Sequence, residues 1–178
     1  FDLAGKHIYP SFIELESNFG IAEQKKSDSR GPQYSSSKKG AFYWNEAIRT
    51  EEEAIQQFTY SKKDAEKLRK LGFGTVLTHI QNGISRGSGS LIALNEKSEL
   101  QVQQAQSSQH YSFQKGASKQ VYPSSQMGAI ALLRQYFYDA QYHEKHLQTE
   151  KVNLTLAANI ENKNLPSFFT VRDRLAIL

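Results

Sequence analysis

Regular alternation of hydrophobic and polar residues first appears in the segment 9–20, YPSFIELESNFG. Ile13 and Leu15 alternate with glutamates, which is the two-residue period of a β-strand. Pro10 is compatible with the start of such a strand, and Gly20 interrupts it. We expect a short buried strand followed by a loop. Polar residues just past the carboxyl end of a strand carry the chemistry of many α/β proteins, so the first candidate site residues are Glu16, Ser17 and Asn18.

A helix followed directly by a second strand is predicted in the segment 61–80. Ser61 has the character of a helix cap, and Gly72 is a typical helix stop. The strand FGTVLTHI at 73–80 then follows with almost no connection, an order typical of a mostly parallel α/β sheet. His79 lies at the end of this strand. It is either a hydrogen-bonding residue at the rim of the sheet or a group that contacts a substrate or a metal ligand.

Two polar stretches separate the predicted elements. The segment 21–39 has almost no hydrophobic residue and predicts a long, mobile surface loop. The segment 81–90, QNGISRGSGS, contains three glycines around Arg86 and predicts a turn that could hold an anion, although it matches neither common phosphate-binding glycine motif. A hairpin at 95–97 then joins LIAL to LQVQQA, which predicts a β-hairpin excursion. A helical stretch is also expected at 51–58.

The last third of the chain predicts two helices and a strand. Hydrophobic residues at helical spacing indicate a long helix over 124–146 and a shorter one over 151–161. The strand LPSFFTV at 165–171 follows, and DRLAIL at 173–178 is typical of the start of another helix. His143 and His146 share a helix face, but their spacing is not that of HExxH, and surface histidines are the simpler interpretation.

Composition narrows the class of protein. The 178 residues and 38% hydrophobic content suit one domain, or at most one and a half, and no run of about 20 hydrophobic residues is present. The net charge of +4, from 22 basic and 18 acidic residues, is too small and dispersed to indicate a nucleic-acid partner. The absence of cysteine excludes disulfides and thiolate chemistry. The beginning at Phe1 favours either a processed exported protein or an excised part of a longer chain.

Several segments resemble the amidohydrolase superfamily. YPSFIELESNFG is similar to its first barrel strand, PGFIDxHxH, and LGFGTVLTHI is similar to the following strand, often GxTTV. YPSSQMGAIALLRQYFYDAQYHEK and LPSFFTV resemble an imidazolonepropionase-like branch that occurs in large bacterial proteins. The resemblance implies a partial (β/α)8 TIM-barrel-like fragment, an α/β domain spanning 1–178 with a polar loop insertion at about 21–40. It also implies an exported or periplasmic location.

The sequence departs from this family at the metal site. The two histidines of HxH fall on Glu16 and Asn18, a weak pair for zinc. A strand that carries a histidine in some relatives has Thr170 here. The resemblance places the remaining metal ligands and the catalytic aspartate beyond Leu178.

Three functions remain open from the sequence. The first is a degenerate, non-catalytic amidohydrolase-like domain without a cofactor, acting as a scaffold or interaction part of a larger protein. Its partner would be the remainder of a longer polypeptide or a second copy, because a partial barrel leaves open sheet edges. The second is a hydrolase of amide or peptide-like bonds that uses zinc or another divalent metal, with Glu16 as a ligand. The third is a module that binds an anion through Arg86.

Overall fold

The computed structural model describes residues 4–24, 31–97, 100–149 and 151–171. Within these residues a five-stranded sheet has the order β1-β2-β3-β4-β5. The outer pairs β1–β2 and β4–β5 are parallel, whereas β3 runs antiparallel to both of its neighbours. The sheet is therefore mixed, and not mostly parallel as the sequence suggested. Its strands are β1 (Phe12–Ser17), β2 (Phe73–Thr78), β3 (Ser85–Ala93), β4 (Val102–Ser112) and β5 (Ser167–Thr170).

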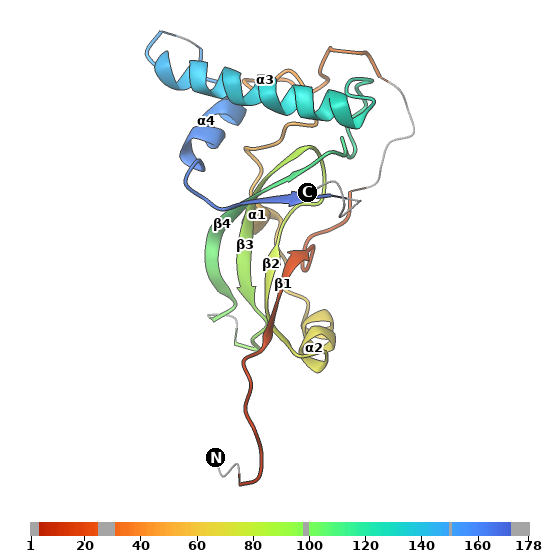
Figure 1. Ribbon diagram of the computed structural model, residues 1–178, viewed down its shortest axis with the longest axis vertical. Helices are drawn as coiled ribbons and strands as arrows, with labels where there is room; N and C mark the ends of the chain where they lie inside the picture. Colours follow the sequence, from red (N-terminus) through yellow and green to blue (C-terminus); the bar gives the residue numbers. More distant parts are fainter. Residues whose placement is uncertain (1–3, 25–30, 98–99, 150, 172–178) are drawn as a thin grey trace.

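Three of the four described helices lie at the two ends of the sheet, and α1 packs against β3. Figure 1 shows α3 and α4 together at the end towards which β1 and β2 point, and α2 at the opposite end. The helix predicted over 51–58 is reduced to the single turn of α1. The bounds of the helices are α1 (Ala54–Gln57), α2 (Lys62–Lys70), α3 (Gln126–Lys145) and α4 (Leu154–Glu161).

Side-chain caps fix the starts of the three longer helices. Ser61 accepts a hydrogen bond from the backbone N–H of Asp64, and Ser125 accepts one from Gly128. The Asn153 side chain accepts from two backbone N–H groups at the start of α4. Each cap satisfies a donor that the first helical turn leaves without a partner. These local interactions explain why the sequence predicted the three helices close to their observed bounds.

Most of the hydrophobic core is divided between the same two ends, and a small third cluster contains Ile21, Ala54 and Ile80. The larger cluster packs α3 and α4 against β4 and the segment 43–48, with Tyr136 and Leu132 at its centre. The second cluster packs Ala65 of α2 against Val76 and Ile92 of the sheet. The central part of β3 and β4 carries buried serines and a histidine instead of hydrophobic residues. The sheet therefore has a polar interior between two hydrophobic ends.

The predicted glycine-rich turn at 81–90 is wrong, because most of it belongs to β3. The hairpin predicted at 95–97 is confirmed, because β3 and β4 pair antiparallel on its two sides, but both strands lie inside the sheet and do not form an excursion from it. Gly87 has φ of +76°, and a Cβ atom there would lie 1.8 Å from the carbonyl oxygen of Glu52. That glycine lets the chain at Glu52 approach the strand closely. A glycine in a strand can thus mark a close backbone approach, although it reads as a turn signal in the sequence.

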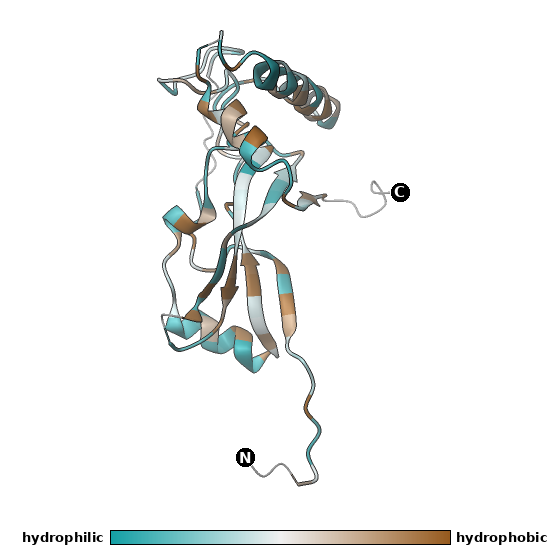
Figure 2. Ribbon diagram, turned by 90° about the vertical axis from the view of Figure 1, so that its left-hand side faces the viewer, coloured by the Kyte–Doolittle hydropathy of each residue, from teal (hydrophilic) through white to brown (hydrophobic). Residues whose placement is uncertain are grey.

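The first predicted strand is present but is not buried. β1 pairs only with β2 in the described sheet, and the side chains of Phe12, Ile13 and Leu15 are 67%, 56% and 51% exposed. Figure 2 shows the alternation of hydrophobic and hydrophilic residues along this strand. β5, also predicted as buried, alternates between exposed and half-buried residues. Both strands lie at the edges of the sheet, where one side of the backbone has no neighbouring strand.

Other parts of the sequence prediction have mixed outcomes. Residues 21–24 and 31–40 contain no helix or strand, whereas 25–30 and the helix start predicted at 173–178 lie outside the described residues. His143, expected at the surface, is 3% exposed. Among the described residues, no helix is long and hydrophobic enough to cross a membrane.

Candidate functional site

Side chains from four strands meet at the end of the sheet to which β1 and β2 point. The cluster contains Glu16 from β1, Arg86 from β3, His110 from β4 and Thr170 from β5, together with His79 just after β2. Four of these five residues were candidates from the sequence. We call this group the strand-end cluster. It brings together residues that lie up to 154 positions apart in the chain.

Arg86 occupies the centre of the strand-end cluster. Its side chain is 7% exposed, and its Nε donates to the carbonyl oxygen of Gly83 at 3.2 Å. Its Nη1 lies 3.2 Å from Thr170 Oγ1, 3.4 Å from His79 Nε2 and 3.7 Å from Glu16 Oε1. The guanidinium is thus surrounded by acceptors from three other strands or strand ends. Burial lowers the pKa of Arg86, and the nearby carboxylate of Glu16 opposes that effect.

Thr170 connects Arg86 to Glu16. Its hydroxyl accepts from the guanidinium and donates to both carboxylate oxygens of Glu16, at 2.7 and 2.8 Å. β1 and β5 stand at opposite edges of the sheet, so this contact brings the two edges together at one end. The sheet is therefore barrel-like at the strand-end cluster.

His79 and His110 form a stacked pair behind Arg86. Their ring centroids lie 3.8 Å apart with an angle of 4° between the planes, and both side chains are completely buried. The ring of Phe168 stacks on His110 from β5, with centroids 5.4 Å apart. The Oγ of Ser108 lies 2.9 Å from His110 Nε2 and fixes the second ring.

Both histidines are neutral over the physiological range. Burial is the largest cause, and the neighbouring His110 and Arg86 add to it, so that the pKa of His79 is lowered to about 2. Burial and the charge of Arg86 lower the pKa of His110 to about 4. An arginine can only donate, so His79 Nε2 accepts from Arg86 and the proton of the ring is on Nδ1. The Nδ1 atoms of both rings are buried and have no hydrogen-bond partner among the described residues.

Asn18, a candidate site residue from the sequence, does not lie beside Glu16 in the strand-end cluster. Its side chain donates to Glu23 Oε1 at 3.3 Å, and it lines a separate groove of about 670 Å³ between the 17–22 segment and α2. The two positions that correspond to HxH therefore do not converge, because β1 ends at Ser17 and the chain turns away. Ser17 is buried, and its hydroxyl accepts from the N–H of Phe19.

His110 was not identified from the sequence. It lies in a polar run, QVQQAQSSQHYS, whose pattern gives no sign that one histidine will be buried. The neighbouring strand holds the signal: a Cβ atom at Gly89 would lie 2.6 Å from His110 Nε2 and 2.7 Å from Ser108 Oγ. Gly89 therefore leaves the space that the His110 ring occupies. That relation needs the register of β3 against β4, which only the folded structure supplies.

The strand-end cluster can neutralise the carboxylate of Glu16, hold the imidazoles of His79 and His110 in the neutral form and join the two edges of the sheet. Among residues 4–24, 31–97, 100–149 and 151–171, no group of three or more histidine, aspartate or glutamate side chains is arranged to hold a metal ion.

Comparison with known proteins supports the fold. No protein-family model and no curated protein matches this chain. The crystal structure of an amidohydrolase from Thermotoga maritima superposes with a TM-score of 0.64 at 18% sequence identity. The match covers 95% of this chain and 46% of the amidohydrolase chain, so the chain spans about half the length of that protein. The fold is amidohydrolase-like.

Proposed function

We propose that this chain is a non-catalytic amidohydrolase-like domain, related to the imidazolonepropionase-like branch, that serves as a scaffold or interaction part of a larger protein. Its parallel pairs β1–β2 and β4–β5 would then belong to the first part of a (β/α)8 barrel, and the antiparallel β3 would be a departure from that architecture. The observation that carries this proposal is the position of the Arg86 guanidinium, within 3.7 Å of Glu16, Thr170 and His79.

The strand-end residues do not fit a divalent metal. The carboxylate of Glu16 already accepts from Thr170 on both oxygens and faces a buried cation. A metal ion on this carboxylate would lie close to the guanidinium, whose side chain is only 7% exposed, and the two like charges would repel. The Asn18 amide, which would supply the second ligand of the motif, contacts Glu23 instead. The cluster therefore uses an internal cation where the family resemblance implies a metal.

The edges of the sheet would supply the surface through which this chain interacts with other chains. β1 exposes Phe12, Ile13 and Leu15 beside a backbone edge that no described strand covers. Exposed hydrophobic edge strands are surfaces on which other chains add. Scaffold and interaction roles are consistent with this surface because neither requires a reacting group.

Metal analysis of the purified protein tests the proposal. We expect less than 0.1 equivalent of zinc, manganese or iron after incubation with each metal and gel filtration, and no hydrolysis of amide or dipeptide substrates. Glu16→Ala should leave the metal content unchanged, as should Asp64→Ala, a matched change of an exposed carboxylate on α2. Stoichiometric metal that is lost in Glu16→Ala but kept in Asp64→Ala would overturn the proposal.

One observation favours the alternative, a metal-dependent hydrolase of amide or peptide-like bonds. The two buried imidazoles are neutral, which is the form that binds metals, and the Nδ1 atom of each has no hydrogen-bond partner among the described residues. In His79 this nitrogen carries the proton, so metal binding there would require the other tautomer. In that case the remaining ligands would come from residues outside this chain. Amidase activity that falls with His79→Ala and with metal removal would establish this alternative, and it would exclude the scaffold as the sole role.

A further inference from the structure

A second cavity, of about 330 Å³, lies between the sheet and the helices α3 and α4. It is separate from the strand-end cluster because neighbouring side chains of β4 face opposite ways. His110 stacks on His79 in the polar interior, whereas Tyr111 contacts Phe137 of α3 on the helix side. β4 therefore separates the two regions. None of the residues of the strand-end cluster lines this cavity.

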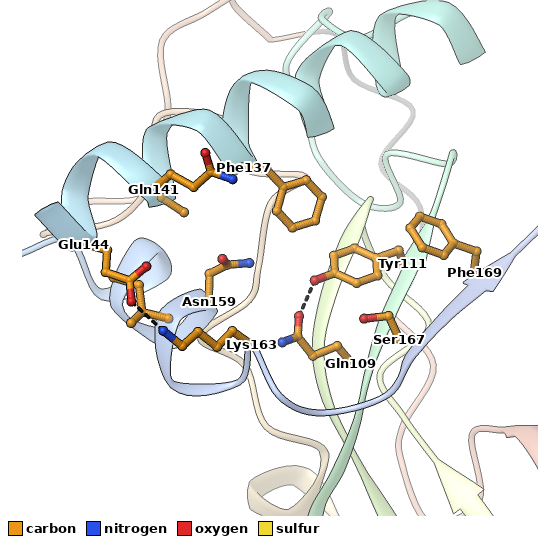
Figure 3. A pocket seen from close by; sticks show the side chains of 11 residues that line it. Gln109, Tyr111, Phe137, Gln141, Glu144, Asn159, Lys163, Ser167 and Phe169 are labelled. Carbon is orange, nitrogen blue, oxygen red and sulfur yellow. Dashed lines mark hydrogen bonds and ion pairs between the residues drawn. The ribbon is translucent and has the colours of Figure 1, made fainter.

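Aromatic rings line one end of this cavity. Tyr111 stacks with Phe169 at 5.0 Å between centroids and packs against Phe137 at 5.8 Å. Phe169 is 48% exposed, so protein atoms do not cover its ring on all sides. Figure 3 shows these three rings grouped at the same end of the cavity. Such an arrangement binds a flat aromatic group by stacking and by burial of its surface.

Opposite charges mark the other end of the cavity. Lys163 Nζ lies 2.6 Å from Glu144 Oε1, and both side chains are partly exposed, at 54% and 41%. In Figure 3 this pair stands away from the rings, with Gln141 and Asn159 between the two ends. A cation and an anion side by side can pair with a carboxylate and an ammonium group that are carried by one carbon atom. The exposed ion pair contributes little to stability, so a ligand can replace its partners at low cost.

The polar groups on the sheet side are already satisfied. The Tyr111 hydroxyl donates to the Gln109 side chain, which in turn donates to the backbone of Asn162. Burial raises the pKa of Tyr111, so its phenol stays protonated. These internal bonds leave the sheet side without a charged group, which suits the ring of a ligand and not its head group.

We propose that this cavity binds a free aromatic α-amino acid of the size of phenylalanine. The ring would lie against Phe137, Tyr111 and Phe169, the α-carboxylate would pair with Lys163 and the α-ammonium with Glu144. The charge arrangement selects a zwitterion, and the aromatic end selects the side chain. This ligand class follows from the cavity alone and does not depend on whether the strand-end cluster is catalytic.

Calorimetric titration of the purified protein with L-phenylalanine tests the proposal. We expect saturable binding, with 3-phenylpropionate, phenethylamine and L-alanine each about tenfold weaker or more, because each lacks one of the three recognised groups. Lys163→Met and Glu144→Gln should each weaken L-phenylalanine about tenfold, and Phe169→Ala should do the same. The matched pair Lys67→Met and Asp64→Asn, an exposed ion pair on α2, should leave binding unchanged.

Three results would overturn this assignment. The first is the absence of binding at millimolar L-phenylalanine while the protein is folded. The second is equal binding of 3-phenylpropionate or of the uncharged N-acetylphenylalanine methylamide, which would indicate a pocket for the aromatic side chain of a peptide. The third is binding that persists in both Phe169→Ala and Lys163→Met. All these variants change exposed side chains, so a circular dichroism melt is sufficient to verify their folding.

Discussion

The hydroxyl of Thr170 donates to both carboxylate oxygens of Glu16, across 154 positions of sequence and between the two edge strands of the sheet. This contact brings the edges of an open sheet together at one end. The buried Arg86 approaches both residues and compensates the charge of Glu16. The first strand and the last described strand are therefore held together by a polar network, not by backbone pairing.

Replacing Thr170 by valine should remove this connection. Valine keeps the shape of threonine but cannot relay the hydrogen bond from Arg86 to Glu16, so we expect a loss of about 1 kcal/mol in the free energy of unfolding. Urea denaturation measures this loss. Ser167→Ala, on an exposed position of the same strand, serves as the control. An equal loss in both variants would show that the hydroxyl of Thr170 has no special role.

The stability of the protein should fall as the pH falls below about 6.5. His79 and His110 have lowered pKa values in the folded chain, so the unfolded chain binds more protons at acidic pH. The loss begins near the unfolded pKa of 6.5 and continues towards pH 4 for His110 and pH 2 for His79, at up to ~1.4 kcal/mol per pH unit for each histidine. Urea denaturation between pH 7 and pH 4 measures it.

Single substitutions measure how much each histidine contributes to this pH dependence of stability. His79→Gln and His110→Gln should each reduce the slope of unfolding free energy against pH by about one proton between pH 6 and pH 5. Carboxylates also titrate at lower pH, but they are unchanged in both variants, so the difference from the original protein isolates the histidine. A slope that stays the same in either variant would contradict the neutral, buried state of that ring.

Gly89→Ala should disturb the ring of His110. The new methyl group would lie 2.6 Å from His110 Nε2 and 2.7 Å from Ser108 Oγ, so these side chains must move, at a cost of about 1–3 kcal/mol. In a double-mutant cycle with His110→Ala, part of that cost should disappear because the ring is no longer in the way. Purely additive effects would mean that the space at Gly89 does not serve His110.

The exposed edge strand β1 should mediate association between copies of the chain. Phe12, Ile13 and Leu15 are more than half exposed beside an edge that no described strand covers. We expect concentration-dependent association in sedimentation velocity, and Leu15→Lys should weaken it because a charge on an edge strand opposes strand addition. Met127→Lys, which changes a more exposed hydrophobic residue on α3, is the control. A monomer at high concentration would contradict this prediction.

Local sequence determined the helices and the positions of most strands. Ser61, Ser125 and Asn153 cap helices that begin close to where the pattern predicted, since a cap acts within one turn of its own residue. The alternation of Ile13 and Leu15 likewise identified β1. Four residues of the strand-end cluster were candidates from the sequence. Glu16 and His79 lie at or near predicted strand ends, Arg86 lies among glycines, and Thr170 was identified through the family resemblance.

Long-range contacts decided the rest. β3 has a glycine- and serine-rich sequence typical of a turn, and it is a strand because β2 and β4 pair with it on both sides. The burial of His110 depends on the absence of a side chain at Gly89, 21 positions earlier. Arg86 is an internal cation because Thr170 and Glu16 reach it from the two edges of the sheet. The sequence alone determined the three longer helices and most of the strands, because those elements depend on neighbouring residues. Only the tertiary structure decided which of these side chains meet, because strand order and register join residues that the chain keeps far apart.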